Sequence, residues 1–172
     1  GEAKGVVHSH LAVAQHHAAG KWILDLQEGD VCWSTAEVGR MTGTVLGAIA
    51  PWTNGVTQLS IAGELDLQTL CQAVQSFKVT VLHTGSETIR RLIESGGDPP
   101  ENYDLTSLRH VVSTGRPLSP KAMEWSEATF GTPVIYGWGQ VETGAPLIVA
   151  GAEGKMPAGC IGKPVAGVEA GV

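Results

Sequence analysis

Short apolar runs of strand length alternate with helix-length segments along this chain, and no other feature constrains its fold as much. We predict strands at residues 31–35, 56–61, 78–83, 108–113 and 133–136. We predict helices between them at residues 42–52, 67–77, 86–93 and 120–130. Repeated strand–helix–strand units need crossover connections, which place the strands side by side and parallel. The expected fold is therefore layered α/β, with a mostly parallel β-sheet and crossover helices.

The ends of the predicted helices carry signals of their own. Asp66 and Ser119 are residue types that cap helix N-termini, and Pro120 would occupy the first helical position, where a missing N–H costs nothing. Gly131 follows the last predicted helix and is a common C-terminal stop. These signals support the helix boundaries independently of the apolar periodicity.

Composition limits the classes of function. The 172 residues, 42% of them hydrophobic, suffice for one domain with a core, so we expect a single α/β subdomain over residues 1–172. A net charge of −6 without a run of Lys or Arg argues against a nucleic-acid partner, and no stretch is long and apolar enough for a membrane span. Three widely spaced cysteines favour free thiols and a cytoplasmic location. The chain lacks an initiator Met and ends at residues 170–172 with no stop signal for its last element, so both ends are expected to be truncated.

Ligands of such sheets bind beyond the carboxyl ends of the strands, so the loops after the strands are the candidate site. These loops are residues 36–40, 84–87, 114–117 and 137–144. The last loop offers glycines for close backbone approach, the aromatic side chain of Trp138 and the carboxylate of Glu142. These groups suit a purine and a phosphate-bound Mg²⁺, because a hard cation prefers oxygen ligands. A plain turn between two strands is the alternative.

Two further segments have a functional and a structural interpretation. In residues 115–118, Gly115 permits close approach to a flat ligand and Pro117 fixes the turn, yet an ordinary strand-to-helix turn would look the same. Lys4 and Gly5 fit the end of a phosphate loop, and a solvated lysine is the alternative.

Four histidines near the N-terminus raise the question of a metal site, which needs convergent ligands. His8 and His10 could share a strand face, whereas His16 and His17 would point apart on a helix. Histidines at the surface or at a helix start are therefore the default interpretation.

Five segments, in this order, resemble the central portion of adenylate-forming acyl-CoA synthetases of the acetyl-CoA and medium-chain kind. They are GEAKGVVHSH at 1–10, GDVCWSTAEVG at 29–39, GRPL at 115–118, GWGQVETG at 137–144 and GCIGKP at 159–164. The resemblance covers essentially the whole chain. It implies part of the large N-terminal domain of that fold, that is, a fragment of an AMP-binding domain.

The resemblance implies a ligase of fatty acid metabolism, which joins a carboxylate to ATP as an acyl-adenylate and then to CoA. Its cofactors would be ATP, Mg²⁺ and CoA, with Glu142 as the metal ligand. The residues that would bind the nucleotide are Lys4, Gly5, Gly115, Arg116, Pro117, Tyr136, Gly137, Trp138, Gly139, Gln140, Val141 and Glu142. The residues that would contact the acyl group or CoA are Val38, Arg40, Met41, Thr42 and Gly139.

This chain departs from the family pattern at several positions. Ala3 replaces the Pro of the Pro-Lys-Gly, Arg116 replaces the Glu of the Gly-Glu-Pro, and Val141 replaces the Thr of the Gln-Thr-Glu. Gly139 stands where acetyl-specific members have Trp, which suggests room for a longer acyl group. Losing a hydrogen bond to a charged group costs about 1.5–3 kcal/mol, so several such losses would weaken ATP binding.

The resemblance also implies parts that this chain does not contain. We find no complete phosphate loop before Lys4, no ribose-binding Asp and no C-terminal domain with a catalytic lysine. We therefore expect a fragment that is not competent alone and that forms homo-oligomers or needs flanking domains. The alternative is a non-catalytic relative with degenerate nucleotide loops that acts as a structural or assembly domain.

Overall fold

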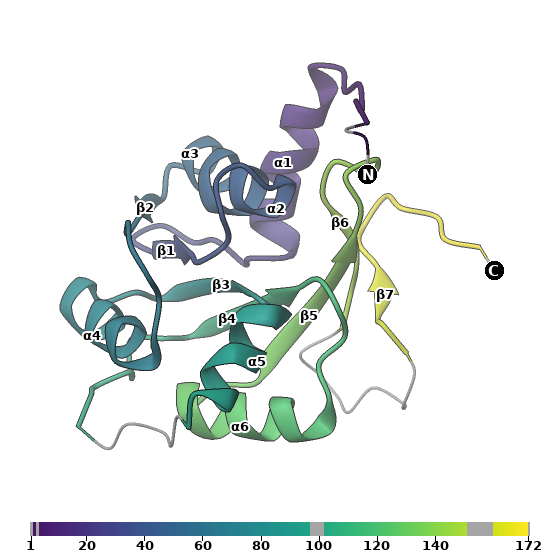
Figure 1. The fold of residues 1–172 in the computed structure, drawn as a ribbon. Helices are drawn as coiled ribbons and strands as arrows, with labels where there is room; N and C mark the ends of the chain where they lie inside the picture. Colours follow the sequence, from purple (N-terminus) through teal and green to yellow (C-terminus); the bar gives the residue numbers. More distant parts are fainter. Residues whose placement is uncertain (1, 3, 97–101, 151–159, 172) are drawn as a thin grey trace.

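The computed structural model describes residues 2, 4–96, 102–150 and 160–171 (Figure 1). Within these residues, seven strands form one sheet in the order β2-β1-β3-β4-β5-β6-β7. The strands are β1 (Val31–Ser34), β2 (Thr57–Leu59), β3 (Val81–Gly85), β4 (His110–Thr114), β5 (Val134–Gly139), β6 (Pro146–Val149) and β7 (Lys163–Pro164). Neighbouring strands from β2 to β5 are parallel, and β6 and β7 are added antiparallel. The prediction of an α/β fold with a mostly parallel sheet is confirmed.

Helices cover both faces of this sheet (Figure 1). One face carries α1 (Leu11–Trp22), α2 (Met41–Thr44), the π-helical turn η1 (Val45–Ile49) and α3 (Ala50–Thr53). The other face carries α4 (Leu67–Phe77), α5 (Ser86–Glu94) and α6 (Pro120–Phe130). No helix among the described residues is both long and apolar enough to cross a membrane.

Each face of the sheet builds its own apolar core, because successive strand residues point to opposite faces. Trp33, Leu82 and Val111 pack with the helices α4, α5 and α6. Their chain neighbours Cys32 and Val81 pack on the opposite side, with α1, η1 and α3. The central strands are therefore buried on both faces, as is usual for parallel sheets.

The predicted helix caps are present. A carboxylate oxygen of Asp66 accepts a hydrogen bond from the N–H of Thr69 at 2.7 Å, so α4 begins where the sequence predicts. The hydroxyl of Ser119 accepts one from the N–H of Ala122 at 3.2 Å. Gly131 ends α6 in the left-handed conformation, at a φ of 70°.

The helix predicted at 42–52 begins one residue earlier and contains η1, a wider turn. Pro51 explains this difference, because in an α-helix its ring would clash with the carbonyl of the residue four positions before it. That residue is Gly47, which lies within the wider turn.

The third strand differs from its predicted position. β3 runs from Val81 to Gly85 instead of over residues 78–83, because Lys78 still belongs to the end of α4. Lys78 has left-handed backbone angles, and the N–H of Val79 donates to the carbonyl of Val74 at 3.1 Å. The left-handed end of α4 therefore includes Lys78, although the sequence around it resembles a strand.

The fifth strand is longer than predicted, and two strands were not predicted. β5 continues to Gly139, and Trp138 pairs with Ile148 of β6, so the first three residues of the loop predicted at 137–144 are strand. β6 and β7 have four and two residues, too few for a recognisable alternating pattern. Residues 140–145 connect β5 to β6.

An ion-pair network holds the opposite edge of the sheet, at the amino ends of the strands. The guanidinium of Arg109 donates to a carboxylate oxygen of Asp30 at 3.0 Å and to one of Asp25 at 2.7 Å. Asp30 is only 6% exposed and also accepts from the hydroxyl of Thr80 at 2.7 Å. Burial alone would raise the pKa of Asp30, but hydrogen bonds from Arg109, Thr80 and the N–H of Gln27 outweigh it and hold that pKa below its usual value.

Candidate functional site

A cavity of about 490 Å³ lies at the carboxyl edge of the parallel strands. The parallel ladders from β1 to β5 bring the ends of these strands to one edge. Residues that follow or end these strands line the cavity, among them Thr35, Ser86, Thr114, Gly115 and Gly137. This is the place where ligands of open α/β sheets bind.

Beneath the cavity, a buried histidine links three strands. One ring nitrogen of His83, Nδ1, is hydrogen-bonded to the hydroxyl of Ser34 on β1 at 2.8 Å. The other, Nε2, is hydrogen-bonded to the hydroxyl of Thr114 on β4 at 2.9 Å. Ser34 also accepts from the N–H of Ala36 at 3.3 Å, so the network reaches into the loop after β1. His83 therefore connects the loops after β1 and β4 at the base of the cavity.

The imidazole of His83 is fully buried, and this burial lowers its pKa from 6.5 to about 4. Between these two values the unfolded chain binds a proton at His83 and the folded chain does not. We therefore predict that stability is complete above pH 6.5 and falls toward pH 4, by up to about 1.4 kcal/mol per pH unit from this group.

Urea unfolding at pH 7 and pH 5 checks this prediction, with His83→Gln as the comparison. The glutamine variant should lose less stability than the parent chain when the pH falls, because it lacks the titrating group. An equal loss in both proteins would contradict the assignment of a neutral buried imidazole.

The loop after β4 is fixed from two sides. The phenol of Tyr136 donates to the carbonyl of Gly115 at 2.5 Å, and the N–H of Arg116 donates to the hydroxyl of Ser86 at 2.9 Å. Gly115 has a φ of 105°, and a Cβ there would lie 3.1 Å from the hydroxyl of Ser86. Burial raises the pKa of Tyr136, so its phenol stays protonated as a donor. The turn therefore needs glycine, and it presents Arg116 from a rigid base.

The loop after β1 lies directly on the first turn of α2. A methyl group added to Gly43 would overlap the carbonyl of Glu37, which means that only glycine permits this close approach. The hydroxyl of Thr44 donates to the carbonyl of Val38 and closes the same contact. These contacts set the position of residues 36–40 at the mouth of the cavity.

The structure brings seven of the predicted site residues together in this cavity. They are Arg40, Met41, Thr42, Gly115, Arg116, Gly137 and Gly139. Tyr136 lies behind them and reaches Gly115 through its phenol. Val38 is 66% exposed and lines a neighbouring cavity of about 390 Å³ instead. Pro117, Trp138, Gln140 and Val141 line none of these cavities.

A second group of predicted residues lies around the turn between β5 and β6. A ring nitrogen of His8 is hydrogen-bonded to the carbonyl of Val141 at 2.8 Å, and the amide of Gln15 donates to the carbonyl of Thr143 at 2.8 Å. These bonds attach the exposed segment with Lys4 and Gly5 to the turn that carries Glu142. Gly1, Ala3 and Gly159, which belong to the predicted motifs, lie outside the described residues.

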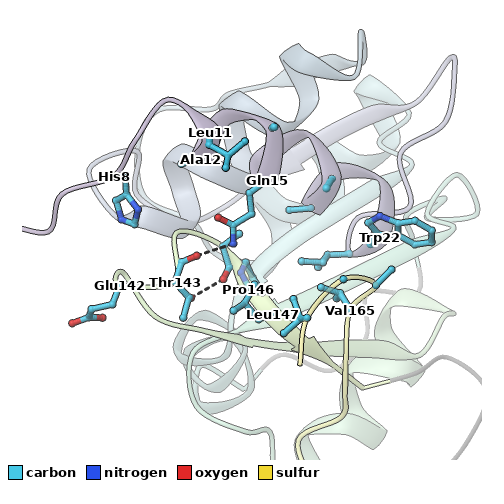
Figure 2. A pocket seen from close by; sticks show the side chains of 18 of the residues that line it. His8, Leu11, Ala12, Gln15, Trp22, Glu142, Thr143, Pro146, Leu147 and Val165 are labelled. Carbon is cyan, nitrogen blue, oxygen red and sulfur yellow. Dashed lines mark hydrogen bonds between the residues drawn. The ribbon is translucent and has the colours of Figure 1, made fainter. Parts of the chain in front are cut away.

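Figure 2 shows the cavity beside this turn, between α1, β6 and the residues 165–168 that follow β7. Its volume is about 560 Å³, and apolar side chains such as Leu11, Trp22 and Leu147 line much of it. The carboxylate of Glu142 points away from the cavity (Figure 2) and makes no hydrogen bond or ion pair with a described residue. The smaller cavity at the strand ends is the better candidate site, because polar side chains at or after the ends of β1, β3 and β4 converge there.

The histidines are not arranged as a metal site within the described part of the chain. His8 and His10 precede α1 and lie on no strand, and a ring nitrogen of His17 is hydrogen-bonded to the carbonyl of Thr53 at 3.1 Å. Among the described residues, no three His, Cys, Asp or Glu side chains are close enough to hold a metal ion together.

Several residues of the cavity did not emerge from the sequence. Ser86, His83 and Thr114 make hydrogen bonds to residues that are far away in the chain. Arg91 reaches the cavity from the second turn of α5. The one available signal was position, since Ser86 and Thr114 fall in two of the four loops expected at the carboxyl edge.

Fold and cavity together define an α/β domain with a cavity at the carboxyl edge of a parallel sheet. The sequence pattern of the AMP-binding enzyme family matches residues 1–172. The chain belongs to that family.

Among curated proteins, the chain is 39% identical to the acetyl-coenzyme A synthetase of Bacillus subtilis over 172 residues, which is 100% of this chain and 30% of that protein. It is 34% identical to the acetyl-coenzyme A synthetase of Chromobacterium violaceum, covering 100% of this chain and 28% of that protein. The chain therefore spans less than a third of the length of these relatives.

Solved structures agree with this relationship. The crystal structure of the Brucella canis acyl-CoA synthetase superimposes with a TM-score of 0.80 at 25% identity, over 95% of this chain and 30% of that one. The anthranilate CoA ligase AuaEII, in complex with anthranoyl-AMP, gives a TM-score of 0.83 at 25% identity, over 95% of this chain and 32% of that one. The acyl-CoA synthetase-like fold predicted from the sequence is confirmed.

Proposed function

We propose that this chain is the central part of an ATP-dependent acyl-CoA synthetase. In the first step, a carboxylate oxygen of the acid attacks the α-phosphorus of ATP and pyrophosphate leaves, which gives an acyl-adenylate. In the second step, the thiol of CoA attacks the acyl carbon and AMP leaves. The match over the whole chain supports this proposal.

The observation that carries the proposal is the cavity at the carboxyl edge of the sheet. Its volume of about 490 Å³ suits a small acid next to part of a nucleotide. Gly115 and Gly137 leave backbone accessible in its wall, which permits close approach of a flat ring. Tyr136 and Ser86 hold this wall in place before a ligand arrives, so little ordering is needed on binding.

We assign roles from the resemblance to the family. The residues at 115–117 and Tyr136 would face adenine, while Arg40, Met41 and Thr42 would contact the acyl group and CoA. Lys4 and Gly5 would lie toward the phosphates. Catalysis by these residues would consist of orientation and charge stabilisation.

The donor set fits the cofactors of the family in part. Guanidinium groups and hydroxyls in the cavity suit phosphate and carboxylate oxygens. Glu142 offers one carboxylate to Mg²⁺, which commonly keeps several waters and binds through one or two carboxylates plus phosphate oxygens. When bound, Mg²⁺ neutralises charge that develops on the phosphates.

Gly139 supports an acid longer than acetate. A Cβ at this position would lie 2.6 Å from the carbonyl oxygen of Ala145 and 2.6 Å from the Cα of Pro146. The backbone of residues 145 and 146 fills that space, so a larger side chain at position 139 would displace this turn. Acetyl-specific members have Trp at this position, and we propose that its absence here leaves room for the additional carbons of a longer acyl chain.

A non-catalytic relative remains the second candidate. Arg116 and Val141 depart from the family pattern, and the Glu142 side chain has no partner among the described residues. On this alternative, the domain keeps its fold and serves assembly without binding nucleotide.

Thermal unfolding of this chain with AMP and with Mg·ATP tests the proposal. A site filled at one hundred times its Kd should add about 2.7 kcal/mol to the free energy of unfolding and raise the melting temperature clearly. Tyr136→Phe should reduce this gain because the carbonyl of Gly115 loses its hydrogen bond.

Tyr103→Phe is the matched control, since Tyr103 packs against the core beneath α4 and α5 and lines none of the cavities. It should leave the ligand-induced gain unchanged. No shift with either nucleotide at saturating concentration would contradict nucleotide binding by this chain and favour the second candidate.

A further inference from the structure

The charges that line the cavity at the carboxyl edge do not balance. Five charged side chains line it, namely Glu37, Arg40, Glu87, Arg91 and Arg116. Arg40 is paired with Glu37 at 3.1 Å on the rim. Glu87 is held by Arg90, which donates from Nε to one carboxylate oxygen at 3.2 Å and from Nη2 to the other. Both acidic groups therefore already have a cationic partner.

Arg91 and Arg116 have no such partner. Neither guanidinium makes a hydrogen bond or ion pair with any residue that the structure describes. Both stand near Glu87, because their charges help the hydrogen bond from Arg90 to hold the pKa of Glu87 below its usual value. Two unpaired positive charges thus face one cavity from two elements, α5 and the loop after β4.

The backbone of Arg116 is held in place, whereas its guanidinium makes no hydrogen bond or ion pair with a described residue. Its N–H is fixed on Ser86, and the carbonyl of the preceding residue, Gly115, is fixed on Tyr136. A guanidinium on such a base offers two parallel N–H donors to a carboxylate with little loss of backbone freedom. The hydroxyls of Thr42 and Thr88 line the same cavity and can add further donors.

We infer that this cavity binds a second negative group on the acid substrate, so that the acid to be activated is a dicarboxylate. This inference rests on the proposed function. One carboxylate would be activated, and the other would lie between Arg91 and Arg116. The backbone at 115–117 would then face adenine, while the guanidinium of Arg116 would bind the acid. The Arg pair shares its cavity with Arg40, Met41 and Thr42, the residues proposed to contact the acyl group. Lys4 and Glu142, proposed for the phosphate end, do not line it.

Titration of the isotope-labelled chain with succinate and with butyrate, followed by amide NMR, tests the inference. The two acids have the same number of carbons and differ in one carboxylate. Succinate should bind about fivefold or more tightly than butyrate, since two partly exposed ion pairs are added. The largest amide shifts should fall on Arg91, Gly115 and Arg116.

Charge variants make the test specific. Arg116→Glu should abolish the preference for succinate, and Arg91→Gln should reduce it. Lys121→Glu is the matched control, because it changes the net charge by the same amount as Arg116→Glu, and Lys121 is exposed on α6 and lines none of the cavities. Equal binding of the two acids, or an equal loss in Arg116→Glu and Lys121→Glu, would overturn the inference.

Two further titrations separate the possible failures. If inorganic phosphate displaces succinate with a similar Kd, the Arg pair is a general anion site and the dicarboxylate assignment is wrong. If AMP binds and succinate shows no preference over butyrate, the inference fails while the proposed function stands. If succinate binds as expected and AMP does not, the anion site is real and the proposed function fails.

Discussion

Replacement of Arg109 by alanine is expected to lower the free energy of unfolding by about 3 kcal/mol. Asp30, only 6% exposed, would keep its negative charge without the guanidinium that now binds it. Asp25 would lose the same partner. Breaking a buried ion pair from one side is costly because the remaining charge stays out of water. Urea unfolding at pH 7 measures the loss.

The control for this prediction is Arg90→Ala. Arg90 also contacts two carboxylates, Glu87 and Glu94, but all three side chains are more than half exposed. Its removal should destabilise the chain much less than Arg109→Ala, because exposed ion pairs contribute little. Similar losses in both variants would show that Asp30 is not held as a buried charge.

The ion pair between Asp30 and Arg109 also makes the free energy of unfolding depend on pH in the acid range. The pKa of Asp30 in the folded chain lies below its ordinary value of 3.8, so its contribution to stability is present above pH 3.8 and is lost as the pH falls through the lower value. This acid dependence should shrink in Arg109→Ala.

Gly43→Ala is expected to cost about 3 kcal/mol and to displace the loop at residues 36–40. The added methyl would overlap the carbonyl of Glu37, which is backbone and cannot rotate away. Either α2 or the loop must move. Urea unfolding gives the loss of stability, and amide NMR shifts at Arg40 and Met41 report the movement of the loop.

Gly39→Ala is the matched control, since Gly39 lies in the same loop and a Cβ there would meet nothing within 4 Å. It should leave both stability and the spectrum of the cavity nearly unchanged. A Gly43→Ala variant as stable as Gly39→Ala would mean that the loop does not rest on α2 as closely as described.

The sequence was sufficient for the features that depend on local chemistry. Asp66 and Ser119 cap helices as predicted, because capping needs only a side-chain oxygen next to free N–H groups. The alternation of strands and helices likewise predicted the parallel sheet and the edge where the cavity lies. These features follow from residues that are close in the chain.

The features that the sequence did not predict depend on contacts over long distances in the chain. Lys78 has strand-like neighbours, yet it ends α4 in a left-handed conformation. β6 exists because Trp138 finds Ile148 as an antiparallel partner, which no short pattern indicates. The predicted nucleotide residues fall into two groups, one around Gly115 and one around Glu142, and their separation depends on how α1 lies against the turn after β5.

The strand order has a consequence for how the chain assembles during synthesis. After β1 and β2 have paired, β3 joins the sheet beside β1, and each strand from β4 to β7 then pairs with the strand made just before it. A chain that leaves the ribosome from its N-terminus can therefore add one strand after another, and no earlier pair has to reopen. From β3 onward, the strand added last is therefore the one that the next strand pairs with.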